Sequence, residues 1–223
     1  MRKIKVSLSM PNIIRVGDLS DFDSWIKTLK SPPANIMYLD DLKRNHKVAE
    51  ILEVNDYQIY HFEGEQHTGF YLHTVSRSNK QSTIDYIVKY TTCFALSYTK
   101  YKALMQSKVW RNDFGPPAEE VLRPIFFEEL LPKFGRMATD WDQTDAGMRM
   151  WKNLVADALR RGLHVYWFNM EDADSIKITN IINKQELIDL SDLIWGTGDY
   201  YRMQIVVISV NPIVDSTIQM VSL

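Results

Sequence analysis

The chain has 223 residues, a formal net charge of −2 and a single cysteine, Cys93. Apolar residues make up 45% and charged residues 24% of the chain, which is typical of a globular protein and excludes a largely disordered one. The sequence has no run of five or six Lys or Arg residues, so binding to nucleic acid or to an anionic membrane through a broad basic surface is not indicated.

Cysteine content and hydropathy indicate the cellular compartment. One cysteine excludes a disulfide framework within the chain and a zinc site built from cysteines, and it favours a reducing compartment. No stretch of about 18 apolar residues occurs, and the amino-terminal residues lack the apolar segment of a secretory signal. We therefore expect a cytoplasmic protein with no membrane contact.

The first 55 residues predict short strands and two helices. Two short β-like runs lie within residues 1–16, and the spacing of apolar residues predicts a helix over Asp21–Lys30. The sequence Ser31-Pro32-Pro33 is expected to end this helix. Asp40 and Asp41 then introduce a second predicted helix, which continues to about Val54.

The next segment predicts an antiparallel sheet. It contains four runs of β character with no helix between them, namely Tyr57–Phe62, Thr68–Ser76, Thr83–Leu96 and Ala103–Arg111. Strands that follow one another through short turns are expected to pair antiparallel.

After Arg111 the pattern changes to alternating helices and strands. The predicted elements, in order, are a helix after Gly115-Pro116-Pro117 with a kink or restart at Pro124, a strand over Gly135–Asp140, an amphipathic helix from Thr144 or Asp145 to Arg161, a strand over Leu163–Asn169, an acidic loop over Glu171–Asp174, a helix over Lys184–Trp195, and a buried strand over Tyr201–Val210, with a tail strand after Pro212. We expect one domain spanning residues 1–223. Residues 1–55 precede a central sheet and cleft formed by residues 56–223.

Several local patterns resemble a known family. They are VWR at Val109–Arg111, IFFEELLPKFG at Ile125–Gly135, D-x-x-Q-T-x-x-G-x-x-x-W from Asp140 to Trp151, and G-L-x-V-Y at Gly162–Tyr166. Together with the order of elements, they resemble the GNAT (acyl-CoA N-acyltransferase) superfamily, and in particular GNAT-like proteins of tailed phages. The resemblance implies an α/β (α+β) fold with a mixed, mostly antiparallel central sheet and helices on both faces.

The resemblance also implies a site. In GNAT proteins acyl-CoA lies where the fourth and fifth strands splay apart, here Ala103–Arg111 and Arg136–Thr139, and its pyrophosphate lies on the loop before the next helix, here Asn112–Ala118. The implied cofactor-binding residues are Val109, Arg111, Gly115 and Ala118, and the implied cofactor is acetyl-CoA. The implied catalytic residues are Asp140, as the base or the residue that orders a water, and Tyr166, as the acid. From the residues alone, Asp140 also fits a helix cap or Asx turn, and Tyr166 also fits a buried core aromatic.

The proposed phosphate loop departs from the usual pattern of small residues. Pro116 and Pro117 lack backbone N–H groups that would face the pyrophosphate. Asp113, Glu119 and Glu120 add negative charge at the same place. Two hypotheses follow: an N-acyltransferase that acts on an unknown amine, or a non-catalytic GNAT-like phage protein that acts by protein–protein binding, as a virion component or as a modulator of a host protein.

The remaining chemical groups favour structural roles. His61 and His73 flank a predicted hairpin as neighbours, but a metal site would need a further ligand on the same face. Cys93 lies in an apolar strand with no adjacent base, which favours a core role. The acidic loop Glu171–Asp174 is most simply a solvated turn, and attraction of a cationic partner is the alternative. We expect no metal site. The chain has no GxGxxG, Walker A, HExxH or GxSxG motif.

Overall fold

The computed structural model describes residues 29–45, 47–54, 57–63, 69–76, 83–93, 103–111, 118–139, 145–172, 175–196 and 204–213. The strands predicted within residues 1–16, nearly all of the helix predicted over Asp21–Lys30 and the tail strand predicted after Pro212 lie outside these ranges.

The described residues form nine strands and several helices around one sheet. In chain order they are α2 (Pro32–Asn45), β1 (Lys47–Val54), β2 (Tyr57–Glu63), β3 (Gly69–Ser76), β4 (Thr83–Cys93), β5 (Ala103–Arg111), α3 (Ala118–Pro124), the π-helix η3 (Ile125–Leu130), α4 (Leu131–Phe134), β6 (Arg136–Ala138), α5 (Asp145–Arg160), β7 (His164–Asp172), β8 (Ser175–Ile181), α6 (Lys184–Asp189), α7 (Ser191–Trp195) and β9 (Gln204–Ser209). None of the helices in these ranges is long and apolar enough to cross a membrane.

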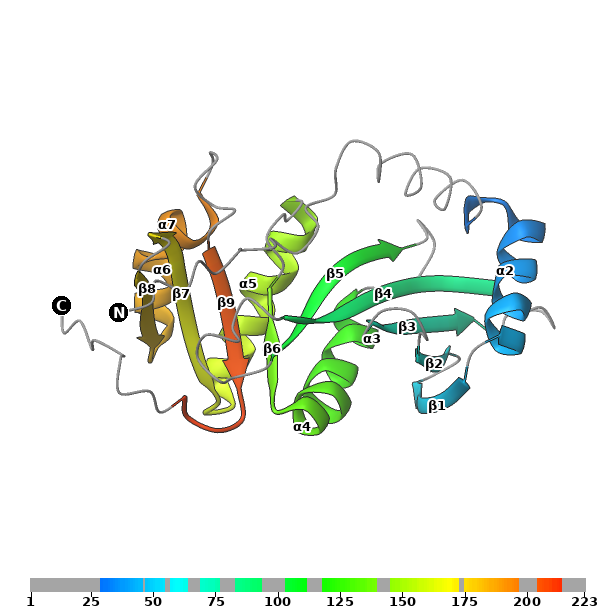
Figure 1. The fold of residues 1–223 in the computed structure, drawn as a ribbon, viewed down its shortest axis with the longest axis horizontal. Coiled ribbons are helices and arrows are strands. Elements are labelled where there is room, and N and C mark those ends of the chain that lie inside the picture. Colours follow the sequence, from blue (N-terminus) through cyan, green and yellow to red (C-terminus); the bar gives the residue numbers. More distant parts are fainter. Residues whose placement is uncertain are drawn as a thin grey trace, which may run out of the picture.

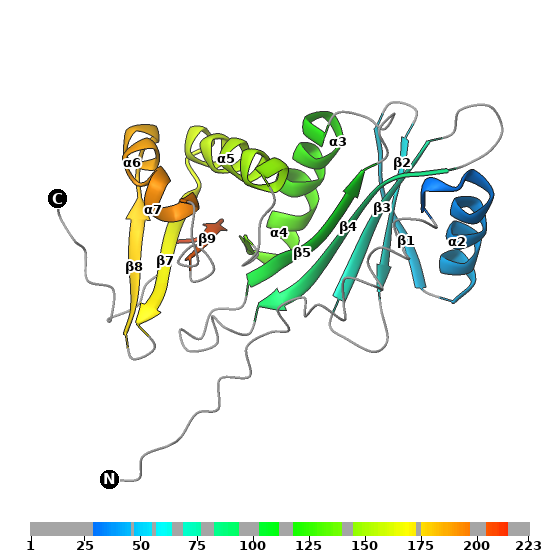
Figure 2. The ribbon, with the colours of Figure 1, turned by 90° about the horizontal axis from the view of Figure 1, so that it is seen from above.

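The sheet is mixed and mostly antiparallel, with the strand order β1-β2-β3-β4-β5-β6-β9-β7-β8 (Figure 1). Strands β1 to β5 form an antiparallel meander, and β5 and β6 are the parallel pair. The late strand β9 lies between β6 and β7 and is antiparallel to both. Helices cover both faces, with α3 to α7 on one side and α2 packed against β4 from the other (Figure 2). The predicted fold class is therefore confirmed.

The middle of β7, Val165–Phe168, and all of β9 are buried on both faces, which explains the nearly continuous apolar sequence there. In β9, Val206 and Ile208 belong to the large core beneath the helices, whereas Ile205 and Val207 belong to a second core on the opposite face. Side chains alternate between the faces of a strand, so both sets must be apolar when both faces are covered. The prediction of a buried late strand is confirmed.

Helix α5 forms and ends as its sequence predicts. Its apolar stripe includes Trp151 and Val155, which are fully buried in the large core. The helix ends where Gly162 adopts a φ of 72°, a left-handed conformation that glycine adopts without a Cβ clash. The Leu163 N–H then donates to the Ala158 carbonyl oxygen at 3.0 Å, which satisfies a carbonyl at the helix end.

The helical segment of residues 118–134 changes its geometry at Pro124, where the sequence predicts a kink or restart. The α-helical turns of α3 end at Pro124, and the π-helix η3 begins at Ile125. Proline has no N–H and its ring crowds the preceding turn, so the usual α-helical hydrogen bond cannot form there. A φ of 74° at Gly135 ends the segment and turns the chain into β6.

The second predicted helix, from Asp40 to about Val54, is confirmed only up to Asn45 and is wrong over Lys47–Val54. The structure instead has helix α2 from Pro32 and strand β1 over Lys47–Val54. Pro32 and Pro33 begin a helix because proline is well tolerated in the first turn, where its missing N–H has no helical partner. Residues Lys47–Val54 form a strand because they pair along β2, a tertiary contact that overrides a weak local helical pattern.

The carboxyl-terminal third also differs from the prediction. Residues expected to be an acidic loop partly belong to β7, which continues to Asp172, and β8 over Ser175–Ile181 was not predicted. β8 pairs antiparallel with β7, and its Ile178 and Ile181 are buried. The predicted helix over Lys184–Trp195 is broken at Leu190 into α6 and α7.

A buried carboxylate joins α3 to α5. Asp157 on α5 is 4% exposed and forms salt bridges with Arg123 of α3 and with Arg160 one turn away. The side chains of Arg123 and Arg160 are 39% and 71% exposed, so water screens the two ion pairs from the arginine side.

We expect Asp157→Ala to lower the free energy of unfolding by about 2 kcal/mol, because it removes the shared acceptor of two arginines at a buried site. The loss is smaller than for a fully buried pair because both arginines can return to water. Urea denaturation followed by circular dichroism measures it. The control is Asp40→Ala at an exposed position of α2, where a change within about 0.5 kcal/mol is expected. Equal losses in the two variants would contradict a special role for Asp157.

Candidate functional site

The sheet divides where β5 meets β6. The two strands are parallel neighbours, as the sequence predicts, and they pair at Leu104 with Met137 and at Met105 with Ala138. Strand β5 continues past this point to Arg111 and stays paired with β4, although the register shifts between Gln106 and Lys108. Beyond Met105, β5 therefore has no β6 partner among the described residues.

Strand β6 stays with β9 instead of following β5. The Thr139 N–H donates to the Val206 carbonyl oxygen at 3.0 Å, and the Val206 N–H donates to Thr139 Oγ1, also at 3.0 Å. Thr139 is buried, so these two bonds hold the end of β6 firmly to its neighbour. Because β5 stays paired with β4 and β6 stays paired with β9, the two strands diverge.

Three of the four predicted cofactor-binding residues belong to described elements. Val109 and Arg111 lie in the diverging part of β5, where their backbones are opposite Val88 and Tyr86 of β4. Ala118 is the first residue of α3. The chain therefore runs from the diverging end of β5 into the start of α3 within a short connection.

The other two predicted site residues of this region, Gly115 and Asp140, lie outside the described ranges. Their predicted roles stay predictions.

The start of α3 fits a diphosphate poorly. Because the helix begins at Ala118, Pro116 and Pro117 directly precede its first turn, and neither has an N–H to donate. Glu119 and Glu120 are the second and third residues of α3, and acidic residues in a helix's first turn disfavour an anion there.

Tyr166 lies on the face of β7 that belongs to the second core. It is 4% exposed, and its hydroxyl oxygen accepts a hydrogen bond from the Ile213 N–H at 2.9 Å. The register places Val207 between Ala138 and Tyr166, so Tyr166 is two strand spacings, roughly 10 Å, from β6. The hydroxyl thus fastens the segment after β9 to the sheet, and the predicted acid role of Tyr166 stays a prediction.

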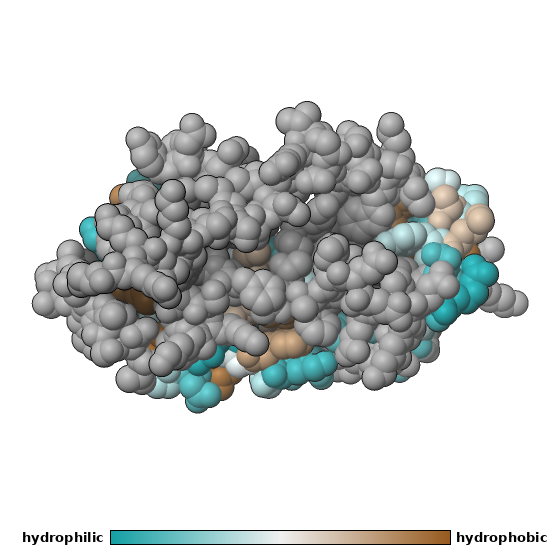
Figure 3. All heavy atoms as spheres, viewed as in Figure 1, coloured by the Kyte–Doolittle hydropathy of each residue, from teal (hydrophilic) through white to brown (hydrophobic). Residues whose placement is uncertain are grey.

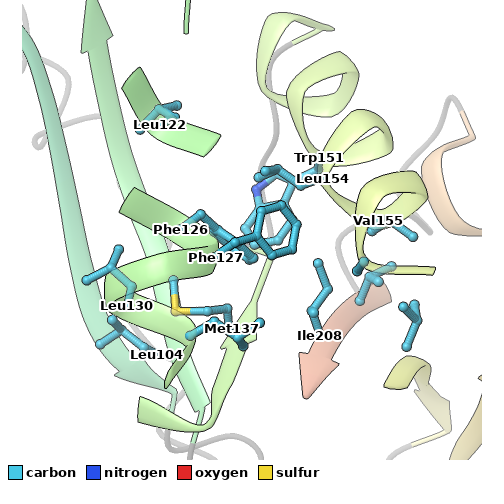
Figure 4. Packing of buried hydrophobic residues seen from close by; sticks show 14 of the residues in the cluster. Leu104, Leu122, Phe126, Phe127, Leu130, Met137, Trp151, Leu154, Val155 and Ile208 are labelled. Atoms are coloured by element: carbon cyan, nitrogen blue, oxygen red, sulfur yellow. The ribbon is translucent and has the colours of Figure 1, made fainter. Parts of the chain in front are cut away.

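Aromatic side chains meet on the other face, between the two helical segments. Trp151 of α5 and Phe126 of η3 point toward one another above Met137 of β6 (Figure 4). Their ring centroids are 5.6 Å apart with an interplanar angle of 85°, an edge-to-face contact. Phe127 stands next to Phe126 at 4.9 Å. These rings close the space between η3 and α5 beside the β5–β6 divergence.

The sequence predicts Trp151 on the buried face of its helix but does not predict its contact with Phe126. The sequence feature related to this contact is Pro124. The π-helix that follows it determines which side chains face α5. The Trp151 indole N–H is buried and has no hydrogen-bond acceptor among the described residues. An unsatisfied buried donor costs about 1–3 kcal/mol, so the packing of the ring must outweigh this cost.

The backbone register of β2 and β3 places His61 and His73 apart. The register pairs His61 with Leu72 and His73 with Tyr60, so the two histidines are not opposite each other as neighbours. No group of three or more His, Cys, Asp or Glu residues that suits a metal ion occurs in the part of the chain that the structure describes. Cys93 is the last residue of β4, opposite Ala103.

One described tyrosine has a shifted pKa. Burial raises the pKa of the Tyr90 hydroxyl above its usual range, because desolvation disfavours the charged phenolate. In the unfolded chain the Tyr90 hydroxyl ionises at about pH 10. The folded-state pKa is the higher one, so the contribution to stability is complete below about pH 10 and is lost as the pH rises above it. Tyr90 is neutral at physiological pH and acts as a core residue.

Comparison with protein-family models, with curated proteins and with solved structures finds no match to this chain.

Proposed function

We propose that this chain is a GNAT-like protein that acts by binding another protein rather than by transferring an acyl group. The resemblance to GNAT-like proteins of tailed phages makes a virion component or a modulator of a host protein the corresponding biological roles. The observation that carries the proposal is the closed aromatic contact of Trp151 with Phe126 beside the divergence of β5 and β6.

The aromatic contact bears on function because acyl-CoA needs an open path along this part of the sheet. Trp151 has no exposed surface, and Leu122 and Leu154 on the two facing helices are also buried. Opening a path between η3 and α5 would therefore separate packed side chains and expose apolar surface to water. The two prolines and the acidic residues at the start of α3 act in the same direction, because they weaken the site for a pyrophosphate.

The second candidate is the N-acyltransferase with acetyl-CoA, and one observation favours it. Strands β5 and β6 are parallel, pair at two positions and then separate, with β9 inserted beside β6. A GNAT protein uses this arrangement to hold its acyl-CoA between the two strands. Asp140 and Tyr166 would then be the residues to test as base and acid.

Titration calorimetry with acetyl-CoA separates the two candidates. We expect no measurable binding at millimolar ligand, because the start of α3 lacks N–H donors and carries like charge. Binding in the micromolar range would contradict the proposal and support the acyltransferase. In that event Arg111→Ala should weaken binding at least about tenfold through the loss of a charge-assisted contact, whereas the control Arg149→Ala, at an exposed position of α5, should not.

A further inference from the structure

A groove lies where the start of α4 and the π-helix η3 meet the ends of α5 and β9. Its volume is about 280 Å³, and it is lined by Phe127, Leu131, Pro132, Arg161, Leu163 and Val210. Five of these six residues are apolar and none is acidic. Figure 3 shows apolar and hydrophilic surface side by side along the lower edge of the molecule, where Figure 1 places α4 and the end of β9.

Two left-handed glycines shape this groove. Gly162 ends α5 and turns Leu163 into one wall, held by the hydrogen bond from its N–H to Ala158. Gly135 ends α4, and its carbonyl oxygen accepts a hydrogen bond from the Val210 N–H at 3.0 Å, which fixes the opposite wall. The positions of Leu163 and Val210 are therefore fixed by backbone hydrogen bonds at the ends of α5 and β9.

The cation of the groove is Arg161. Its guanidinium lies over the ring of Phe127 at 4.3 Å from the ring centroid, which keeps the charge at the groove. The neighbouring Arg160 is paired with Asp157, whereas no carboxylate pairs with Arg161 within the described ranges. A cation at the end of a helix is favourable in itself, but that role needs neither the apolar walls nor the contact with Phe127.

The size of the groove limits its occupant. Pockets for cofactors and drug-sized ligands usually have volumes of about 300–1,000 Å³ and bury most of the ligand, whereas this groove is smaller and open on one side. A single large apolar side chain inserted into a small pocket beside an arginine is, in contrast, a common anchor of protein interfaces. Val210, 39% exposed, offers apolar surface at the edge of the groove.

We propose that this groove binds a segment of a partner protein that presents one large apolar side chain with an acidic residue beside it. This inference rests on the proposed function, because it names the surface through which the protein contacts its partner. The apolar side chain enters between Pro132, Leu163 and Val210, the apolar lining residues with exposed surface. The carboxylate accepts hydrogen bonds from the Arg161 guanidinium, which is held ready by Phe127.

Selection from a random dodecapeptide library on the full chain tests the proposal. The expected result is enrichment of peptides with Phe, Leu or Trp next to Asp or Glu. The dissociation constant of an enriched peptide, measured by fluorescence polarisation, should rise about tenfold with Arg161→Gln and at least as much with Val210→Asp. Both positions are exposed, so both variants should keep their fold, which circular dichroism checks.

Matched controls and a double-mutant cycle locate the contact. Arg149→Gln and Leu193→Asp make the same changes at exposed positions of α5 and α7 and should leave the dissociation constant within about twofold. Replacing the acidic residue of the peptide with its amide should weaken binding to the unmodified chain about tenfold but should have little effect on the Arg161→Gln variant.

An empty selection would overturn the proposal. So would peptides that are indifferent to Arg161→Gln and Val210→Asp, although such peptides would leave a protein-binding function in place at another surface. Micromolar binding of acetyl-CoA is the separate result that would contradict the proposed function itself.

Discussion

Trp151→Ala is expected to lower the free energy of unfolding by about 4 kcal/mol, because it removes a fully buried indole and leaves a cavity between η3 and α5. The neighbours Phe126 and Leu154 belong to separate helices, so they cannot both move inward to fill the space. Chemical denaturation followed by circular dichroism provides the measurement.

Two further variants make the Trp151 result specific. Trp151→Phe keeps an aromatic ring and removes the N–H that has no acceptor, so we expect it to cost less than about 1.5 kcal/mol. Met37→Ala, at a position that is 70% exposed on α2, should change stability by less than about 0.5 kcal/mol. A loss below about 1 kcal/mol for Trp151→Ala would mean that the aromatic contact does not hold η3 to α5.

Asn35→Ala is expected to lower the free energy of unfolding by about 3 kcal/mol. Asn35 is 2% exposed, and its side chain makes three hydrogen bonds. Its Nδ2 donates to the carbonyl oxygens of Leu29 and Ile84 at 2.9 and 3.0 Å, and its Oδ1 accepts from the Ile84 N–H at 2.8 Å. Alanine would leave these buried backbone groups without their partners, at a cost of about 1–3 kcal/mol for each group that water does not reach.

The same variant should release α2 from β4. The Asn35 side chain hydrogen-bonds to both the carbonyl oxygen and the N–H of Ile84. The Ile84 amide should therefore exchange its hydrogen much faster in Asn35→Ala than in the unmodified chain. Amide exchange measured by NMR gives the result residue by residue. Asn180→Ala at an exposed position of β8 is the control, and it should leave both stability and the Ile84 exchange rate unchanged. Unchanged protection at Ile84 in Asn35→Ala would contradict this role of the side chain.

The contacts around Trp151 and those between α2 and β4 differ in chemical kind. The large core joins η3, α5 and the strands β6, β7 and β9 through apolar side chains alone in the region of Trp151. Helix α2, in contrast, is fastened to β4 by the polar side chain of Asn35, whose bonds have directions as well as distances. We therefore expect replacements in the first region to be graded by volume and those at Asn35 to depend on hydrogen-bonding capacity.

Local sequence was sufficient for α5 and β9. The i, i+3, i+4 spacing of residues such as Trp151 and Val155 defines one apolar face, and Gly162 marks the end of the helix because it adopts a positive φ. The apolar run of β9 indicates a strand covered on both faces. The change of helix type after Pro124 follows from the missing N–H of proline.

Other features depend on contacts between distant segments. Lys47–Val54 is a strand because it pairs with β2, and Ser175–Ile181 is a strand because it pairs with β7. Neither strand could be recognised from the local sequence pattern alone. The divergence of β5 from β6 arises because Thr139 bonds to Val206, a residue 67 positions away. The groove at Arg161 needs the start of α4 and the ends of α5 and β9 together. Sequence by itself thus determined the faces and ends of individual elements, whereas hydrogen bonds and packing across long chain separations, which only the tertiary structure contains, decided the strand order, the β5–β6 divergence and the groove.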